Sequence, residues 1–134
     1  MREIRFRAWD KKACRFVWSG PIQNFPTIND DDMVLSYKWE KGRLIKTLSC
    51  MDDLIWMEHT GLRDRAGQEI YEGDIVNIFK SITSMMGNQN VRVNAVVRFI
   101  AAAFRFDSGD GATAVHSSSN IIGNIYENPE LLEK

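Results

Sequence analysis

The chain is poor in the features that mark secreted, fibrous or membrane proteins. Among 134 residues there are two cysteines, Cys14 and Cys50, far apart, and three prolines. No apolar run approaches the roughly 18 residues of a membrane-spanning helix. The segment 1–4 lacks the apolar core of a secretory signal. We therefore expect a cytoplasmic protein with reduced thiols and no membrane partner.

An excess of charge of one sign is also missing. Lysine and arginine total 17 and aspartate and glutamate 18, which gives a net charge of −1. Proteins that grip nucleic acid through many phosphates are usually basic overall, and this chain is not. Hydrophobic residues make up 44% and charged residues 26%, as in ordinary soluble domains. The length suits one domain with one core.

Motifs for catalysis and metal binding are likewise missing. Cys14, Cys50, His59 and His116 are of zinc-ligand type, but they lack the paired spacing of zinc sites. Asp30–Asp32 lacks the alternating ligands, the glycine and the distal glutamate of a calcium loop, so we interpret it as a solvated acidic loop. Neither a nucleophile elbow nor a phosphate-binding loop occurs. We expect no metal, no cofactor and no enzymatic activity.

Short β-type runs separated by glycine and aspartate turns fill most of the chain. Residues 91–99 alternate most clearly and should place Val91, Val93, Ala95 and Val97 inward. The expected strands are 2–9, 15–18, 33–39, 44–48, 54–57, 75–79, 91–99, 101–106 and 121–126, and residues 81–90 appear as a polar excursion. The pattern predicts an all-β fold.

The densest set of turn signals lies at residues 60–76, T-G-L-R-D-R-A-G-Q-E-I-Y-E-G-D-I-V. Its three glycines suit tight turns, where a positive φ penalises other residues. Glu72 and Asp74 are two nearby carboxylates, which could act as a catalytic acid–base pair. In a turn between strands, however, Asp74 should accept hydrogen bonds from backbone amides and Glu72 should face solvent. We favour this structural interpretation.

Three separated motifs carry a family resemblance. The central one consists of Thr60, Gly61, Leu62, Asp64, Gly67, Ile70, Glu72, Gly73, Asp74 and Val76. The others are the opening R-F-R-A-W-D at residues 5–10 and the closing segment 122–131, which contains Gly123 and Asn124. Together they resemble the YopX-like family of phage and prophage proteins.

The resemblance implies an SH3-like small barrel and a tendency to self-associate, without implying any activity. We predict a single domain made of an N-terminal β-hairpin region (1–53), an SH3-like β-barrel (54–126) and a C-terminal tail (127–134). The leading hypothesis is a phage- or prophage-encoded, non-enzymatic binding or scaffold module that forms a homo-oligomer in the bacterial cytoplasm. Its protein partner cannot be read from the sequence.

The tryptophans also favour self-association. Trp9, Trp18, Trp39 and Trp56 are too many and too large to fit together inside one small barrel. We expect one or two of them at an interface between subunits, where large aromatic side chains contribute most.

A nucleic-acid-binding surface is the alternative. Positive charge gathers near the N-terminus, and tryptophans are interleaved on the expected outer face, as on barrels that bind single strands. The residues of this surface are Arg2, Arg5, Arg7, Trp9, Lys11, Lys12, Arg15 and Trp18. The competing interpretation is an edge hairpin that its charges keep soluble, or whose aromatic residues a neighbouring subunit covers.

Overall fold

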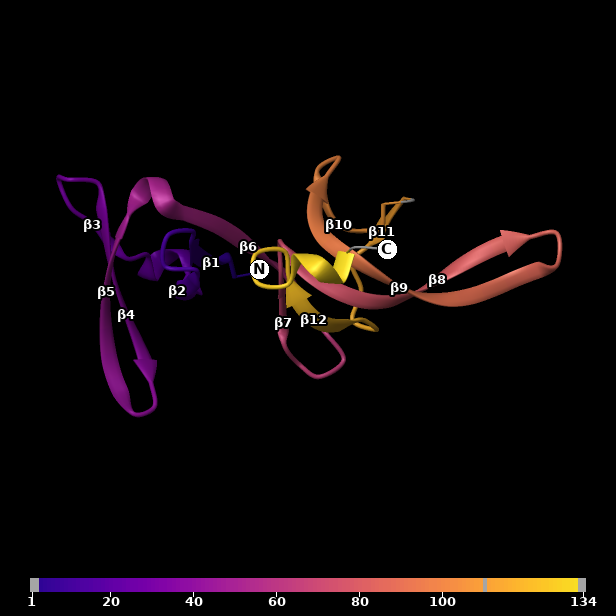
Figure 1. Cartoon of the computed structure of the whole chain (residues 1–134), viewed down its shortest axis with the longest axis horizontal. Helices are drawn as coiled ribbons and strands as arrows, with labels where there is room; N and C mark the ends of the chain where they lie inside the picture. The colour runs from indigo at the N-terminus through magenta and orange to yellow at the C-terminus, as the bar shows by residue number, and fades with distance from the viewer. Residues whose placement is uncertain (1–2, 110, 133–134) are drawn as a thin grey trace. The chain divides into compact units, whose positions relative to one another are not determined.

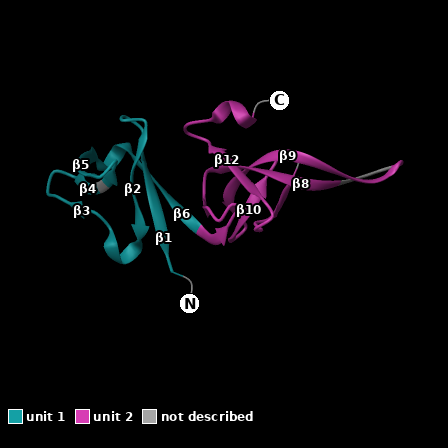
Figure 2. Cartoon of the chain, turned by 90° about the horizontal axis from the view of Figure 1, so that it is seen from below, with its two compact units in different colours: residues 1–59 teal, residues 60–134 magenta. Residues whose placement is uncertain are grey.

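A computed structural model describes residues 3–109 and 111–132, apart from the side chains at positions 38 and 82–84 (Figure 1). Its regular elements are antiparallel β-strands and short 3₁₀ turns, so the all-β prediction is confirmed. The chain divides into two compact units, residues 1–59 and residues 60–134 (Figure 2). We describe each unit by itself.

The first unit contains two sheets. Its elements are β1 (Arg5–Asp10), β2 (Arg15–Pro21), η1 (Ile22–Asn24), β3 (Thr27–Ile28), β4 (Met33–Glu40), β5 (Arg43–Cys50), η2 (Met51–Asp53) and the first part of β6 (Leu54–Arg63). β1 lies between β2 and β6, and β4 lies between β3 and β5. The predicted N-terminal hairpin and the β4–β5 hairpin, which turns at Lys41 and Gly42, are both present.

Asp10 fixes the first turn of this unit. Its carboxylate accepts hydrogen bonds from the backbone amides of Lys12 at 2.9 Å and Ala13 at 3.0 Å, and from the Ser49 hydroxyl at 2.8 Å. Burial alone would raise the pKa of Asp10, but these hydrogen bonds and the charge of Arg15 outweigh burial and lower it. The ionised side chain therefore joins the β1–β2 turn to β5.

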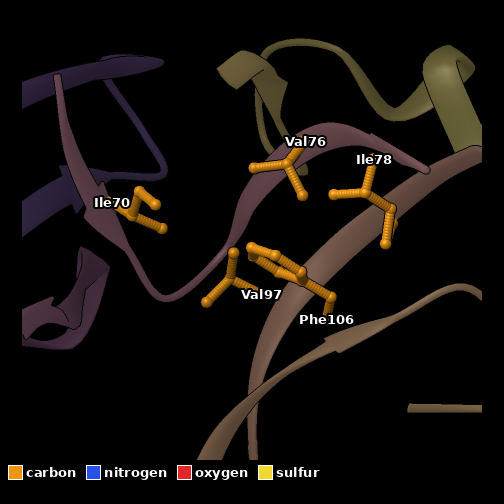
Figure 3. Packing of buried hydrophobic residues seen from close by; sticks show 6 residues of the cluster. Ile70, Val76, Ile78, Val97 and Phe106 are labelled. Carbon is orange, nitrogen blue, oxygen red and sulfur yellow. The ribbon is translucent and has the colours of Figure 1, made fainter. Parts of the chain in front are cut away.

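The second unit is built on a five-stranded sheet in the order β11-β10-β9-β8-β12. Its elements are β7 (Glu69–Tyr71), β8 (Asp74–Ser84), β9 (Gly87–Ile100), β10 (Ala103–Asp107), β11 (Ala112–Ala114), β12 (Asn120–Asn124) and η3 (Pro129–Leu132), preceded by the end of β6. The buried core, shown in Figure 3, comprises Ile70, Val76, Ile78, Ala95, Val97 and Phe106. Ala95 and Val97 face inward, as the alternation of β9 predicts.

Two expectations about this unit do not hold. The SH3-like barrel is not confirmed, because none of the sheets of the described residues closes on itself, and β11 and β12 are the outermost strands of the five-stranded sheet. The prediction of a polar excursion at 81–90 is wrong, since β8 and β9 stay paired from Ser81 and Asn90 to Ser84 and Gly87. Polar side chains do not prevent strand pairing where a hairpin carries no core, because the backbone supplies the ladder.

Candidate functional site

The residues of the 60–76 motif form a turn scaffold. Gly61, Gly67 and Gly73 have φ angles of 90°, 86° and 88°, a region that a β-carbon disfavours. The Thr60 hydroxyl donates to the carbonyl of Ile70 at 2.9 Å. Of the remaining motif residues, Ile70 and Val76 lie in the core and Leu62 is exposed.

Asp64 is the centre of this scaffold. One carboxylate oxygen accepts hydrogen bonds from the amides of Ala66 and Gln68, both at 2.9 Å, and the other accepts from the amide of Ile121 at 3.0 Å. Burial would raise the pKa of Asp64, but the backbone donors outweigh burial and hold the pKa below its ordinary value. The carboxylate therefore stays ionised and joins the turn to β12.

The two other acidic residues of the motif also differ in environment. Asp74 is buried and accepts a hydrogen bond from the backbone amide of Tyr71 at 2.8 Å, the kind of role predicted for it. Glu72, predicted to face solvent, is half-buried instead. The bonds seen at Asp64 and Asp74 hold the backbone, which is a structural function.

Gly123 and Asn124 lie at the end of β12 and shape the turn that follows it. The β8–β12 register shifts between Ile121 and Gly123, the bulge that the glycine predicts. A β-carbon on Gly123 would lie 2.5 Å from Oδ1 of Asn128. The Asn124 side-chain oxygen accepts from the amides of Tyr126 at 3.0 Å and Glu127 at 2.9 Å.

The N-terminal basic surface differs from its prediction at both tryptophans. Trp9 is only 5% exposed and packs edge-to-face on Phe16, so its predicted outer position is wrong. The cause is a register shift between Ala8 and Trp9, after which strict alternation of faces fails and both residues are buried. Trp18 is half-buried and packs against Phe25 and Trp56.

Three arginines of that surface each contact a different residue close by. Arg5 pairs with Glu3 at 2.8 Å, and the Arg7 guanidinium lies 4.6 Å from the centre of the Phe16 ring. Arg15 donates to the Thr47 hydroxyl at 3.2 Å. The exposed residues Lys11, Lys12 and Arg15 remain on this surface, while Arg2 lies outside the described residues.

The residues considered for zinc do not come together. Cys14 is exposed, Cys50 is half-buried, and neither forms a disulfide. His116 packs on Phe106, and its Nδ1 accepts from the amide of Ser118 at 3.2 Å. Within residues 3–109 and 111–132, no cluster of three metal-ligating side chains forms.

The strongest candidate for a binding site is one face of the β4–β5 hairpin. Residues opposite one another in register are Leu35 and Leu48, Tyr37 and Lys46, and Trp39 and Leu44. Because side chains alternate along a strand, these six share one face. Trp39 is 71% exposed, and Tyr37, Leu44 and Leu48 are each more than half exposed. We call Leu35, Tyr37, Trp39, Leu44 and Leu48 the apolar β4–β5 face.

The opposite side of the same hairpin is covered over part of its length. Val34, Ser36 and Ser49 are buried there, and the Ser36 hydroxyl donates to the carbonyl of Val17 on β2 at 3.1 Å. The hairpin thus packs part of one face into the first unit and presents the other, apolar face to solvent. Sequence reasoning found both strands and not this face, although the alternate apolar residues on each side of the Lys41–Gly42 turn indicate it.

By its fold, this is an all-β protein of open antiparallel sheets, whose turns are stabilised by glycines and buried aspartates. The family model described as YopX protein matches residues 5–133, and the chain belongs to the YopX family. This confirms the resemblance seen in the sequence motifs. In the part of the chain that the structure describes, no helix has the length and apolarity to cross a membrane.

A solved structure is similar over the whole chain. The crystal structure of protein EF1440 from Enterococcus faecalis has 24% sequence identity and a TM-score of 0.60, and the alignment covers 99% of this chain and 100% of that chain. At this identity the likeness supports the fold alone. No curated protein matches the sequence.

Proposed function

We propose that this protein is a non-enzymatic, phage- or prophage-encoded binding module that self-associates through the apolar β4–β5 face in the host cytoplasm. The observation that carries the proposal is the exposure of Trp39 beside Leu44 on a face with a single charged residue, Lys46. Contiguous exposed apolar surface on a soluble protein marks an interaction site. Aromatic residues are enriched at the centres of such interfaces.

The composition of the face favours a protein partner over nucleic acid. Leu44 lies opposite Trp39, and Lys46, opposite Tyr37, is the single cation of the face, whereas a nucleic-acid platform would need several cations for the phosphates. The predicted N-terminal nucleic-acid surface is not favoured, because Trp9 is buried and cannot stack on a base. A second copy of the chain offers the same apolar face and fits it by two-fold symmetry.

The free energy gained by burying this face is close to the cost of association, so we expect a weak, reversible oligomer. Two copies that pack this face together bury Tyr37, Trp39, Leu44 and Leu48 from each side. Because each side chain is already partly covered, burial contributes roughly 1 kcal/mol apiece, on the order of 8 kcal/mol in all. This gain lies in the lower part of the range of about 4–15 kcal/mol that association costs, so neighbouring contacts must add to it.

Light scattering of the full chain tests the proposal. We expect the wild type to form a discrete oligomer at micromolar concentration and the double variant Trp39→Ser/Leu44→Ser to scatter as a monomer of 15.4 kDa. The matched control is Ile22→Ser/Ile122→Ser, which removes two exposed apolar residues outside the face. A monomeric wild type, or equal dissociation of the control, contradicts the proposal.

A further inference from the structure

The second unit contains a long stretch without acidic residues. Residues 75–106 include Lys80, Arg92, Arg98 and Arg105 and no aspartate or glutamate, although the whole chain has a net charge of −1. The stretch is also rich in side-chain amides, at positions 77, 88, 89, 90 and 94. Local positive charge with amide groups is the composition of surfaces that contact nucleic acid.

This stretch forms a projecting two-stranded ribbon. β12 pairs with β8 at Asp74–Asn77, and β10 pairs with β9 at residues 96–100. Between these pairings and the tip, β8 and β9 continue together, and Figure 1 shows them extending away from the other strands of this unit. We call residues 78–93 the β8–β9 ribbon.

The two cations of the ribbon lie on opposite faces. Arg92 is opposite Phe79, with its guanidinium carbon 4.2 Å from the ring centre, and it donates to Oδ1 of Asn77 at 2.6 Å. Lys80, one residue along β8, points to the other face and donates to the Ser108 hydroxyl at 3.1 Å. An ammonium has three donors, so Lys80 retains capacity for a further acceptor.

The tip of the ribbon is apolar. Met85 and Met86 at the turn are almost fully exposed, and Gly87 follows with a φ of 105°. Exposed Asn88, Gln89 and Asn90 then lead back along β9. Large apolar side chains that lie in solvent at the end of a projecting polar hairpin are suited to contact with another molecule.

We propose that the β8–β9 ribbon binds double-stranded DNA, a role that goes beyond self-association. A two-stranded β-ribbon fits the major groove of B-DNA, which is about 12 Å wide. Cations on both faces can then meet phosphates on both walls of the groove. Side-chain amides can bond to base edges, and the methionine tip can enter between base steps, as apolar wedges do. The major groove of duplex RNA is too narrow for this ribbon.

Fluorescence anisotropy with a mixed-sequence duplex at low salt tests the phosphate contacts in the full chain. We expect Lys80→Gln/Arg92→Gln to weaken binding by about tenfold or more and to reduce the salt slope by nearly 2, because each lost phosphate contact removes about 0.9. The matched control is Lys11→Gln/Lys12→Gln, which removes the same charge from the exposed N-terminal turn. It should bind within about threefold of the wild type, since its charges lie outside the ribbon.

A second variant tests the tip without endangering the fold. Met85→Ser/Met86→Ser changes only exposed side chains, so its thermal unfolding should match the wild type. We expect it to bind more weakly and to lose the DNA bending that energy transfer between the duplex ends reports. Failure of the wild type to bind duplex, preference for single strands, or equal binding by the wild type and both ribbon variants overturns the proposal.

Discussion

Asp64 accepts a hydrogen bond from the backbone amide of Ile121 at 3.0 Å, across 57 positions of sequence. The same carboxylate holds the turn of residues 64–68 through the amides of Ala66 and Gln68. One side chain therefore fixes a local turn and attaches the last strand of the second unit to it. This explains an aspartate in the family motif without assigning it any chemistry.

Replacing Asp64 should destabilise the second unit. Asp64→Ala leaves three backbone amides without their charged acceptor, and we expect a loss of about 3 kcal/mol in the free energy of unfolding. Chemical denaturation of the full chain measures it. Asp31→Ala, at an exposed position, is the control and should change stability by less than about 0.5 kcal/mol. Equal effects of the two substitutions would refute this role of Asp64.

Acid should weaken the fold through the same groups. The pKa values of Asp10 and Asp64 are lowered in the folded state relative to the ordinary value of 3.8. Each ionised carboxylate therefore contributes its full stabilisation above the unfolded pKa, and the contribution is lost as pH falls through the folded pKa. Unfolding free energies measured at successive pH values should show this decline below about pH 5. Asp64→Asn should flatten it, and an unchanged decline in that variant would contradict the assignment.

Gly123 should not tolerate even a methyl group. In Gly123→Ala the new β-carbon would meet Asn128 at 2.5–2.9 Å, so we expect a loss of about 1–3 kcal/mol. Gly111→Ala is the matched control, because nothing lies within 4 Å of its added carbon. Thermal unfolding of both variants compares them. Adding Asn128→Gly to Gly123→Ala should recover part of the loss, and no recovery would show that the contact is not the cause.

The β9–β10 turn should be open to stabilisation. Ala101 and Ala102 have φ angles of 52° and 65°, where a β-carbon is disfavoured, and they form a two-residue connection between the paired residues Ile100 and Ala103. Asn-Gly is the preferred sequence for such a turn. We expect Ala101→Asn/Ala102→Gly to raise the unfolding free energy by about 1 kcal/mol. A lower melting temperature would argue against this turn geometry.

The strands that alternate could be predicted from the sequence, and the irregular places could not. β9 alternates over a core, and the alternation of residues 91–97 indicates its inward face. The burial of Trp9 could not be predicted in this way, because a register shift after Ala8 breaks the period of two. No pattern within β1 alone indicates that shift.

The apolar β4–β5 face and the β8–β9 ribbon could be recognised in full only once the pairing of their strands was known. Residues 81–90 are mostly polar and show no regular alternation of apolar residues, so hydrophobic periodicity does not mark them as strand. The apolar β4–β5 face depends on which residues lie opposite one another, and residues 33–35 are apolar on both faces of β4. The sequence shows apolar residues that alternate on each side of the turn, and the register adds that Trp39 lies opposite Leu44.

Quenching of Trp39 fluorescence tests most directly whether the apolar β4–β5 face is covered in solution. The difference between the wild type and Trp39→Phe isolates this residue, since the other tryptophans, Trp9, Trp18 and Trp56, are buried or half-buried. At nanomolar concentration a soluble quencher should reach Trp39, which is 71% exposed in the single chain. At high micromolar concentration, self-association should protect it. Equal quenching at every concentration would contradict a role for this face in self-association.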